Sequence, residues 1–286
     1  MKLVIGTAQF GSNYGLANKS GELSRNEINL ILKFAKKKGI KELDTAIGYG
    51  NSEKKLGVLN IRNMNVITKI PRFNGDINDL QKWIMNNVLN SCNRLGVKKL
   101  HGLLLHSPNQ LLEPIGKKIF YFLELLKQKD MVENIGVSIY SPNELDYYFN
   151  NFHFDIVQAP FNIFDTRIRD SGWLNNLKRK NVKLYVRSIF LQGLLLLPSF
   201  ERKPYFKKWS ELNKWDEWIE QTKMKPLEAC IKFVKNQDGI DRVVVGVDSL
   251  NQLEEIWNIF QKKTRLPNFN WGDVSETLIS PQKWSL

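Results

Sequence analysis

The stretch from Glu42 to Gly57, ELDTAIGYGNSEKKLG, joins a short apolar run to an acid and then to a tyrosine on a glycine-flanked turn. The acid is Asp44 and the tyrosine is Tyr49. Either residue alone has an ordinary explanation, since an acid can cap a turn and a tyrosine can pack on one. Together they indicate a proton donor and a group that tunes it, if other strands bring partners to the same place.

Short apolar runs like this one recur along the whole chain. They are rich in Val, Ile and Leu rather than alternating, which is typical of parallel strands buried on both faces. The runs cover residues 2–7, 40–46, 65–70, 100–106, 133–138, 154–160, 182–188 and 241–247.

Helical patterns separate the runs. Ser24 and Glu27 have the spacing of a capping box at the start of a helix over 24–38. Further helices are expected over 141–150, 168–180 and 226–237. Three more helices are expected because apolar residues recur at helical spacing and form one face of each. The three faces are Ile77, Leu80, Ile84, Val88 and Leu95; Leu111, Ile115, Ile119, Phe122 and Leu126; and Leu250, Leu253, Ile256 and Phe260.

Strands and helices that alternate in this way over about 250 residues predict an α/β fold, a single (β/α)8 TIM barrel. A doubly wound sheet is the main alternative, but it would carry a G-x-G-x-x-G turn, and GTAQFGSNYG is not one. We expect one domain over 1–286, with a Trp-rich insertion at about 200–224 and a C-terminal tail from about 263.

Charge and composition narrow the classes of partner. The net charge is +13, but the lysines are scattered and no basic run is interleaved with aromatic residues, so we expect no nucleic-acid partner. The longest apolar run, Ser188 to Pro198, is shorter than the ~20 residues that span a bilayer, and the N-terminal run is too short for a signal peptide. We therefore expect a cytoplasmic protein without a membrane partner, in which Cys92 and Cys230 are reduced core residues and no metal is bound.

In a TIM barrel, functional side chains gather at the C-terminal ends of the strands. Those ends carry Asp44 with Tyr49 beyond it, then Lys69 and then His106. A free tyrosine has a pKa near ~10, and a buried lysine beside it favours the phenolate. Asp44 would keep Lys69 charged and oriented, and His106 would hydrogen-bond the carbonyl oxygen of a substrate or the Tyr49 hydroxyl. Such an array protonates an alkoxide without a metal. Of the other histidines, His101 opens a strand and His153 precedes one, so both should lie away from these strand ends and are expected to be structural.

Over nearly its whole length the sequence resembles the aldo-keto reductase family. The resemblance lies in LDTAIGYGNSEKKLG, VITKI and LLLHSP, which hold the four residues above. It continues in IGVSIYSPNEL, FDIVQAPFNIFD, SIFLQGLLL and VVVGVDSLNQLEEI. It implies catalytic roles for Tyr49, Asp44, Lys69 and His106, and a bound NADP or NAD that extends across the barrel mouth.

The resemblance also implies the cofactor contacts. Ser138 and Gln158 would hold the carboxamide, the loop from Ser188 to Leu194 would cover the pyrophosphate, and residues 246–255 would cradle the adenosine end. The implied cofactor-binding residues are Thr7, Asp44, Ser138, Gln158, Arg187, Ser188, Gln192, Gly193, Gly246, Asp248, Gln252 and Glu255.

Three positions depart from the family's usual pattern. Ile139 stands where an asparagine is common, and Arg187 stands where an aromatic residue stacks on the nicotinamide, a place where a planar guanidinium would stack instead. Asp248 stands where many NADPH-dependent relatives have a serine. An acid there repels a 2′-phosphate and suits a free ribose hydroxyl, so NADH is expected to serve at least as well as NADPH.

We therefore expect an NAD(P)-dependent oxidoreductase of carbohydrate metabolism. It would interconvert a carbonyl and an alcohol on a sugar, a sugar derivative or a nucleotide sugar, because the loops beside the site carry polar residues. It would act as a monomer or homodimer. The loop after the first strand offers Gln9, Phe10, Asn13 and Tyr14 for the substrate site. The alternative is a nicotinamide-binding, redox-sensing regulatory protein with little turnover, against which the intact set of four residues argues.

Overall fold

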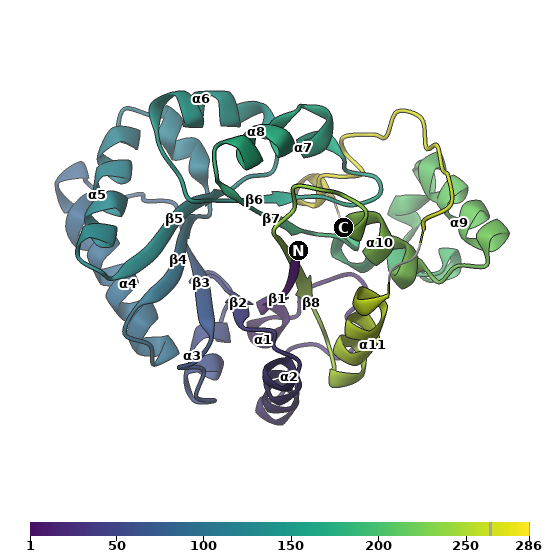
Figure 1. Ribbon diagram of the computed structural model, residues 1–286, viewed down its shortest axis with the longest axis horizontal. Coiled ribbons are helices and arrows are strands. Elements are labelled where there is room, and N and C mark those ends of the chain that lie inside the picture. Colours follow the sequence, from purple (N-terminus) through teal and green to yellow (C-terminus); the bar gives the residue numbers. More distant parts are fainter. Residues whose placement is uncertain (263–264, 286) are drawn as a thin grey trace.

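The protein is built around a closed barrel of parallel strands, seen in the computed structural model, which describes residues 1–262 and 265–285 (Figure 1). Eight strands follow one another around the barrel in sequence order, and β8 closes it by pairing with β1. They are β1 Lys2–Gly6, β2 Glu42–Asp44, β3 Asn65–Ile70, β4 Leu100–Leu105, β5 Val132–Ser138, β6 Ile156–Pro160, β7 Lys183–Arg187 and β8 Arg242–Gly246. The predicted (β/α)8 barrel is confirmed.

Helices surround the barrel, and their buried apolar side chains join the core around the strands (Figure 1). The α-helices are α1 Ala8–Gly11, α2 Arg25–Lys37, α3 Ser52–Gly57, α4 Leu80–Leu95, α5 Gly116–Gln128, α6 Leu145–Asn151, α7 Arg167–Asp170, α8 Trp173–Arg179, α9 Ser210–Thr222, α10 Pro226–Lys235 and α11 Leu250–Gln261. Short 3₁₀ helices join them at Ile77–Asp79, Pro108–Leu112, Pro142–Glu144, Leu191–Leu196, Ser199–Glu201, Pro204–Lys208 and Pro281–Lys283.

Some helical details differ from expectation. The helix expected over 168–180 is broken at Gly172, whose φ of 80° is left-handed, and becomes α7 and α8. Ile77 lies in a 3₁₀ turn before α4 and is 42% exposed, so it does not extend the buried face. In α5 the expected Ile119 and Leu126 are buried, together with Leu123, while the expected Phe122 is only partly buried against the core.

The predicted capping box at the start of α2 forms only in part. The Ser24 side chain accepts a hydrogen bond from the Glu27 backbone N–H, as expected. The Glu27 carboxylate, however, accepts from the backbone N–H of Leu250 at 2.7 Å. It therefore ties α2 to the N-terminus of α11 instead of closing the box, because anions are stabilised at helix N-termini.

The insertion folds as a helical unit on the rim of the barrel. Its helix α9 buries Trp215 and Trp218, and their indole N–H groups donate to the carbonyls of Leu195 and Asn268. Trp271 of the tail packs edge-on against both tryptophans, so the insertion and the tail share one aromatic cluster. The expected start of the tail, at about residue 263, lies outside the described residues.

Side chains close the inside of the barrel at its N-terminal end. A small apolar cluster fills the interior, and one of its members, Tyr185, donates from its hydroxyl to the Glu42 carboxylate at 2.7 Å. Arg242 donates to the same carboxylate at 2.6 Å. Since this end is filled and satisfied, ligands can enter the barrel only at the C-terminal ends of the strands.

Candidate active site

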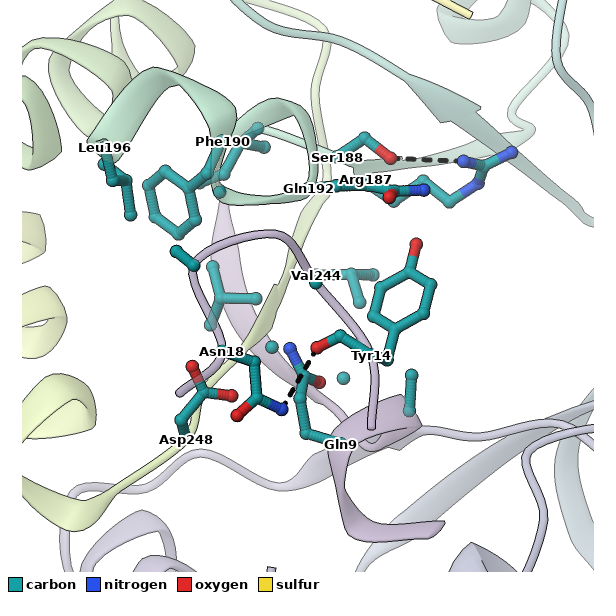
Figure 2. A pocket seen from close by; sticks show the side chains of 18 of the residues that line it. Gln9, Tyr14, Asn18, Arg187, Ser188, Phe190, Gln192, Leu196, Val244 and Asp248 are labelled. Atoms are coloured by element: carbon teal, nitrogen blue, oxygen red, sulfur yellow. Dashed lines mark hydrogen bonds between the residues drawn. The ribbon is translucent and has the colours of Figure 1, made fainter. Parts of the chain in front are cut away.

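A cavity of about 590 Å³ opens at the C-terminal ends of the strands. Its size is typical of small-molecule and cofactor sites. Its walls come from the strand ends, the loop after β1, the loop after β7, and the first turns of α10 and α11. Figure 2 shows side chains of the β7 loop, such as Phe190 and Gln192, on the wall opposite Gln9 and Asn18 of the first loop.

The turn that carries Tyr49 is fixed by a backbone contact that only glycine allows. Gly50 has a φ of 51°, and a Cβ atom on it would lie 2.1 Å from the carbonyl oxygen of Gly11 in α1. A Cβ atom on Gly11 would lie 2.0 Å from the Tyr49 carbonyl oxygen. The glycines therefore let α1 pack directly on the turn, which sets the position of Tyr49.

A buried carboxylate holds the same turn from the other side. Glu53, in the first turn of α3, is 2% exposed and accepts from the Thr68 hydroxyl at 2.7 Å and the Ser91 hydroxyl at 2.5 Å. Arg94 completes the network with an ion pair at 2.6 Å. Because the charge of Glu53 is fully compensated, α3 is anchored to β3 and α4 just after the Tyr49 turn.

Asp44 and Lys69 form a buried ion pair beneath the cavity. The Lys69 ammonium donates to both carboxylate oxygens of Asp44, at 2.8 and 2.7 Å, and to the Thr45 carbonyl at 3.0 Å. Burial by itself lowers the pKa of Lys69, but the neighbouring Asp44 carboxylate outweighs it and the pKa is raised above its ordinary value. The cation is therefore permanent at physiological pH.

Tyr49 lies between this cation and His106. The Lys69 ammonium is 5.0 Å from the centroid of the Tyr49 ring, and the His106 ring meets it edge-on at 5.8 Å. Burial, followed by the positive charges of Lys69 and Arg187, lowers the pKa of His106 to about 4. The imidazole is consequently neutral at physiological pH and has one N–H group to donate to a substrate oxygen.

Most of the residues predicted for the site line this one cavity. Lys69 and Gln158 are the exceptions, because both are buried below the wall. The Gln158 amide donates to Asp44 at 2.7 Å, so its expected contact with a carboxamide stays a prediction. The predicted residues on the wall are Thr7, Asp44, Tyr49, His106, Ser138, Arg187, Ser188, Gln192, Gly193, Gly246, Asp248, Gln252 and Glu255.

The loop after β7 has the backbone of a phosphate-binding segment. Ser188, Leu191 and Gln192 all have positive φ, a strain that is concentrated at functional sites. The backbone N–H groups of the neighbouring Ile189 and Phe190 donate to none of the described residues. Both residues line the cavity, so these amides are free to bind an anion such as a pyrophosphate.

The far end of the cavity holds a carboxylate oxygen without a partner. Asp248 Oδ1 is buried and accepts no hydrogen bond within the described part of the chain. Burial raises the pKa of Asp248, while Gln252 acts in the opposite direction. A buried acceptor left unsatisfied is costly, and a ribose hydroxyl is a donor of the right kind. The free amides of the loop after β7 suit a pyrophosphate and the unpaired Asp248 Oδ1 suits a ribose hydroxyl, so together they fit a nicotinamide dinucleotide.

Several wall residues escaped the sequence analysis. Tyr140 has a signal that could have revealed it, because it follows the strand-end residue Ser138 by two positions. Gln282, in contrast, reaches the cavity only through the packing of the tail, for which the sequence has no local signal. In the first loop Gln9 and Tyr14 line the cavity as expected. Phe10 does not, because it is fully buried in the core, and neither does the fourth candidate, Asn13.

Two negative findings apply to residues 1–262 and 265–285. No group of His, Cys, Asp and Glu side chains there is arranged to hold a metal ion. No helix there is long and apolar enough to span a bilayer. Cys92 and Cys230 are free and buried, as predicted.

Comparison with known proteins places this geometry in context. The model of the aldo/keto reductase family matches residues 2–277. No match is found among curated proteins. Among solved structures, an aldo-keto reductase from Bacillus halodurans in its holo form is 20% identical over 92% of this chain and 87% of its own, with a TM-score of 0.74. A glycerol dehydrogenase from Gluconobacter oxydans has the same identity and coverage and a TM-score of 0.71. A putative aldo-keto reductase from Pseudomonas aeruginosa is 20% identical over 90% of this chain and 88% of its own, with a TM-score of 0.67.

Proposed function

The chain belongs to the aldo/keto reductase family, and on that basis we propose that it interconverts a carbonyl and an alcohol on a sugar or sugar derivative, with Tyr49 as general acid and base. As a member of the family it is an NAD(P)-dependent oxidoreductase. The observation that carries the proposal is the placement of Tyr49 between the Lys69 cation and neutral His106 on the cavity wall.

In the direction of reduction, the Tyr49 hydroxyl gives its proton to the oxygen of the substrate carbonyl. Lys69 stabilises the phenolate that remains, because its charge is close to the ring and Asp44 raises the pKa of the ammonium. His106 donates an N–H to the same substrate oxygen, which polarises the carbonyl and orients it toward Tyr49. In the direction of oxidation, the phenolate takes the proton back.

The nicotinamide cofactor supplies the hydride when it is bound. Thr7 and Ser138 would face its nicotinamide end, and a contact of Gln158 with the carboxamide would require its amide to leave Asp44. The stacking of Arg187 on the ring stays a prediction from the family pattern, and it competes with the contact of the guanidinium with the Tyr140 ring. The β7 loop from Ser188 to Gly193 would hold the pyrophosphate. Gly246, Asp248, Gln252 and Glu255 would hold the adenosine. NAD and NADP are both candidates, and Asp248 favours NAD.

Two observations support a sugar-like substrate. One is the polar side chains that the first loop places on the wall, among them Gln9, Tyr14 and Asn18. The other is the glycerol dehydrogenase among the solved structures with this fold, since glycerol is a polyol. Hydroxyl groups of a sugar are donors and acceptors that amide side chains pair with. A role in carbohydrate metabolism, in the cytoplasm, is part of the proposal.

Steady-state turnover tests it. The purified protein is assayed with NADH and with NADPH against simple aldehydes, aldoses and ketoses, and with NAD⁺ and NADP⁺ against polyols. The oxidation or reduction of the cofactor is followed by its absorbance. We expect turnover with at least one class, fastest with hydroxylated substrates. Cofactor binding without turnover on any class would instead support a redox-sensing regulatory protein.

A further inference from the structure

Arg187 is a partly buried cation that makes no ion pair with a carboxylate of residues 1–262 or 265–285. It ends β7 on the cavity wall, and its guanidinium donates to the Ile139 carbonyl at 3.0 Å and to the Ser188 hydroxyl at 3.2 Å. Both acceptors are neutral. The remaining N–H groups of the guanidinium are available to a ligand, since two are used in this way.

The other arginines of comparable burial show that this is unusual for the chain. Within the described residues, Arg94, Arg167, Arg202 and Arg242 are also partly or fully buried, and each lies against a carboxylate at 2.6 or 2.7 Å. A buried charge without a counter-ion is costly. The exception at Arg187 is therefore explained if an anion arrives with a ligand.

The neighbours of Arg187 hold it in place without neutralising it. Its guanidinium carbon lies 4.7 Å from the centroid of the Tyr140 ring, in a cation–π contact. The Tyr14 hydroxyl points toward the side of the cavity where Arg187 lies (Figure 2). Tyr14 is 40% exposed as a whole, but partial desolvation of its hydroxyl, followed by the nearby Tyr49, raises its pKa, so it is a neutral donor there.

The charges along the cavity differ between its two ends. At the reaction end Asp44 cancels Lys69 and His106 is neutral, which leaves Arg187 as the net charge. At the far end, Asp248 and Glu255 outnumber Lys225, the single cation among the described residues that line it. An anionic group is thus attracted to the reaction end and repelled from the other.

We propose that Arg187, with Tyr140 and Tyr14 beside it, is a specificity-determining residue that binds an anionic group of the substrate. The natural substrate is then a carbonyl compound that carries a carboxylate or a phosphate. This inference rests on the proposed function, since it takes the substrate to react at Tyr49. A planar guanidinium with free N–H groups binds either kind of anion in a bidentate manner.

Matched pairs of substrates test the proposal. Succinic semialdehyde is compared with butyraldehyde for the carboxylate, and glyceraldehyde 3-phosphate with glyceraldehyde for the phosphate. We expect the wild type to prefer at least one anionic member. Arg187→Met should lower kcat/KM for that member ~10- to 100-fold, mainly through KM, and leave its neutral partner within about threefold, because the lost contact is a charge-assisted hydrogen bond. Arg187→Lys should fall between.

The matched control is Lys225→Met, which removes the cation at the far end of the cavity. It should leave the ratio of anionic to neutral kcat/KM unchanged. Titration calorimetry with succinate and with glycerol 3-phosphate adds a readout that needs no turnover, and Arg187→Met should weaken the binding of one of them about tenfold or more. The melting temperature shows whether each variant is folded.

The outcomes distinguish a failure of the proposed function from a failure of the anion site at Arg187. If the wild type binds these anions through Arg187 but turns over no carbonyl compound, the proposed function fails and the anion site stands. If the wild type turns over neutral and anionic partners equally, and Arg187→Met changes neither ratio nor anion binding, the anion site is wrong and the proposed function stands. The anion site would also be overturned if Arg187→Met weakened the binding of NADH or NADPH but not the binding of the anions, because Arg187 would then act on the cofactor.

Discussion

The Lys69 ammonium lies against the face of the Tyr49 ring, 5.0 Å from its centroid, and gives its N–H groups to Asp44 and to the Thr45 carbonyl. Lys69 therefore acts on Tyr49 by its electric field and not by a hydrogen bond to the hydroxyl. The hydroxyl stays free to meet the substrate oxygen. Asp44 determines where the charge lies, so it is a positioning residue for Tyr49.

Removal of the Tyr49 hydroxyl should stop proton transfer and little else. In Tyr49→Phe we expect kcat to fall by roughly 10²–10⁴-fold, the usual contribution of a general acid. Cofactor affinity, measured by fluorescence titration, should stay within about twofold because the ring remains in place. A variant that keeps more than half of the wild-type kcat would show that another group donates the proton.

Lys69→Met should remove the field that stabilises the phenolate, and also leave Asp44 without its counter-ion. We expect a loss of kcat of about 10²-fold or more, because the phenolate left after proton transfer loses the positive charge over its ring. The rate is measured with saturating cofactor. Lys69→Met with Asp44→Asn, which removes both charges, is the control for stability. A folded Lys69→Met variant with a kcat near that of the wild type would contradict the role of Lys69.

His106 makes the stability of the protein depend on pH in a defined window. Its pKa is about 4 in the folded state and 6.5 in the unfolded state, so the unfolded chain binds more protons between these values. Stability from neutral His106 is thus present above pH 6.5 and is lost as the pH falls toward 4. At about 1.36 kcal/mol per pH unit, the loss is at most about 3 kcal/mol.

Urea denaturation of the wild type and of His106→Gln between pH 5 and pH 7.5 measures this effect. As the pH is lowered, the unfolding free energy of the wild type should fall more than that of His106→Gln. His101→Gln is the matched control, because His101 lies outside the cavity and pairs with Glu133. Parallel curves for wild type and His106→Gln would mean that His106 is not kept neutral by the fold.

Gly50→Ala should displace the Tyr49 turn. The new methyl group would meet the Gly11 carbonyl oxygen at 2.1 Å, and a φ of 51° is strained for alanine. We expect a loss of about 1–3 kcal/mol in stability and a fall in kcat greater than the fall in cofactor affinity. Gly48→Ala is the control, because a Cβ atom there has no neighbour within 4 Å. Equal kinetics for both variants would show that the contact does not position Tyr49.

The barrel and its reaction centre could be predicted because their signals are local. Each strand is a continuous apolar run, and the ends of parallel strands meet at one rim, so Asp44, Tyr49 and His106 were expected together. The environment of Arg187 could not be predicted, since its lack of a carboxylate depends on every element around it. The same holds for Glu27, whose carboxylate caps a helix more than 200 positions away, and for Gln158, which the fold turns toward Asp44.

The choice between NADH and NADPH depends on Asp248. A carboxylate within about 4 Å of a 2′-phosphate costs roughly 1–4 kcal/mol, which is about fivefold to several hundredfold in affinity. Arg242 begins β8, the strand that leads to Asp248, but it cannot offset this repulsion, because it is bonded to Glu42 at the other end of the barrel. We therefore expect the wild type to use NADH at least as well as NADPH.

Asp248→Ser should move the ratio of kcat/KM values toward NADPH by about tenfold, because it removes the repulsion and leaves a hydroxyl donor. It should also weaken the binding of NADH, since the substitution removes the buried Oδ1 that would accept a hydrogen bond from a ribose hydroxyl. The matched control is Glu255→Gln, an acid at the same end that is paired with Lys225 at 3.6 Å. It removes the same charge from a more exposed place and should change the ratio little, because solvent screens it. If the wild type already prefers NADPH strongly and Asp248→Ser leaves both cofactors unchanged, Asp248 does not face the ribose, and the adenosine must bind elsewhere in the cavity.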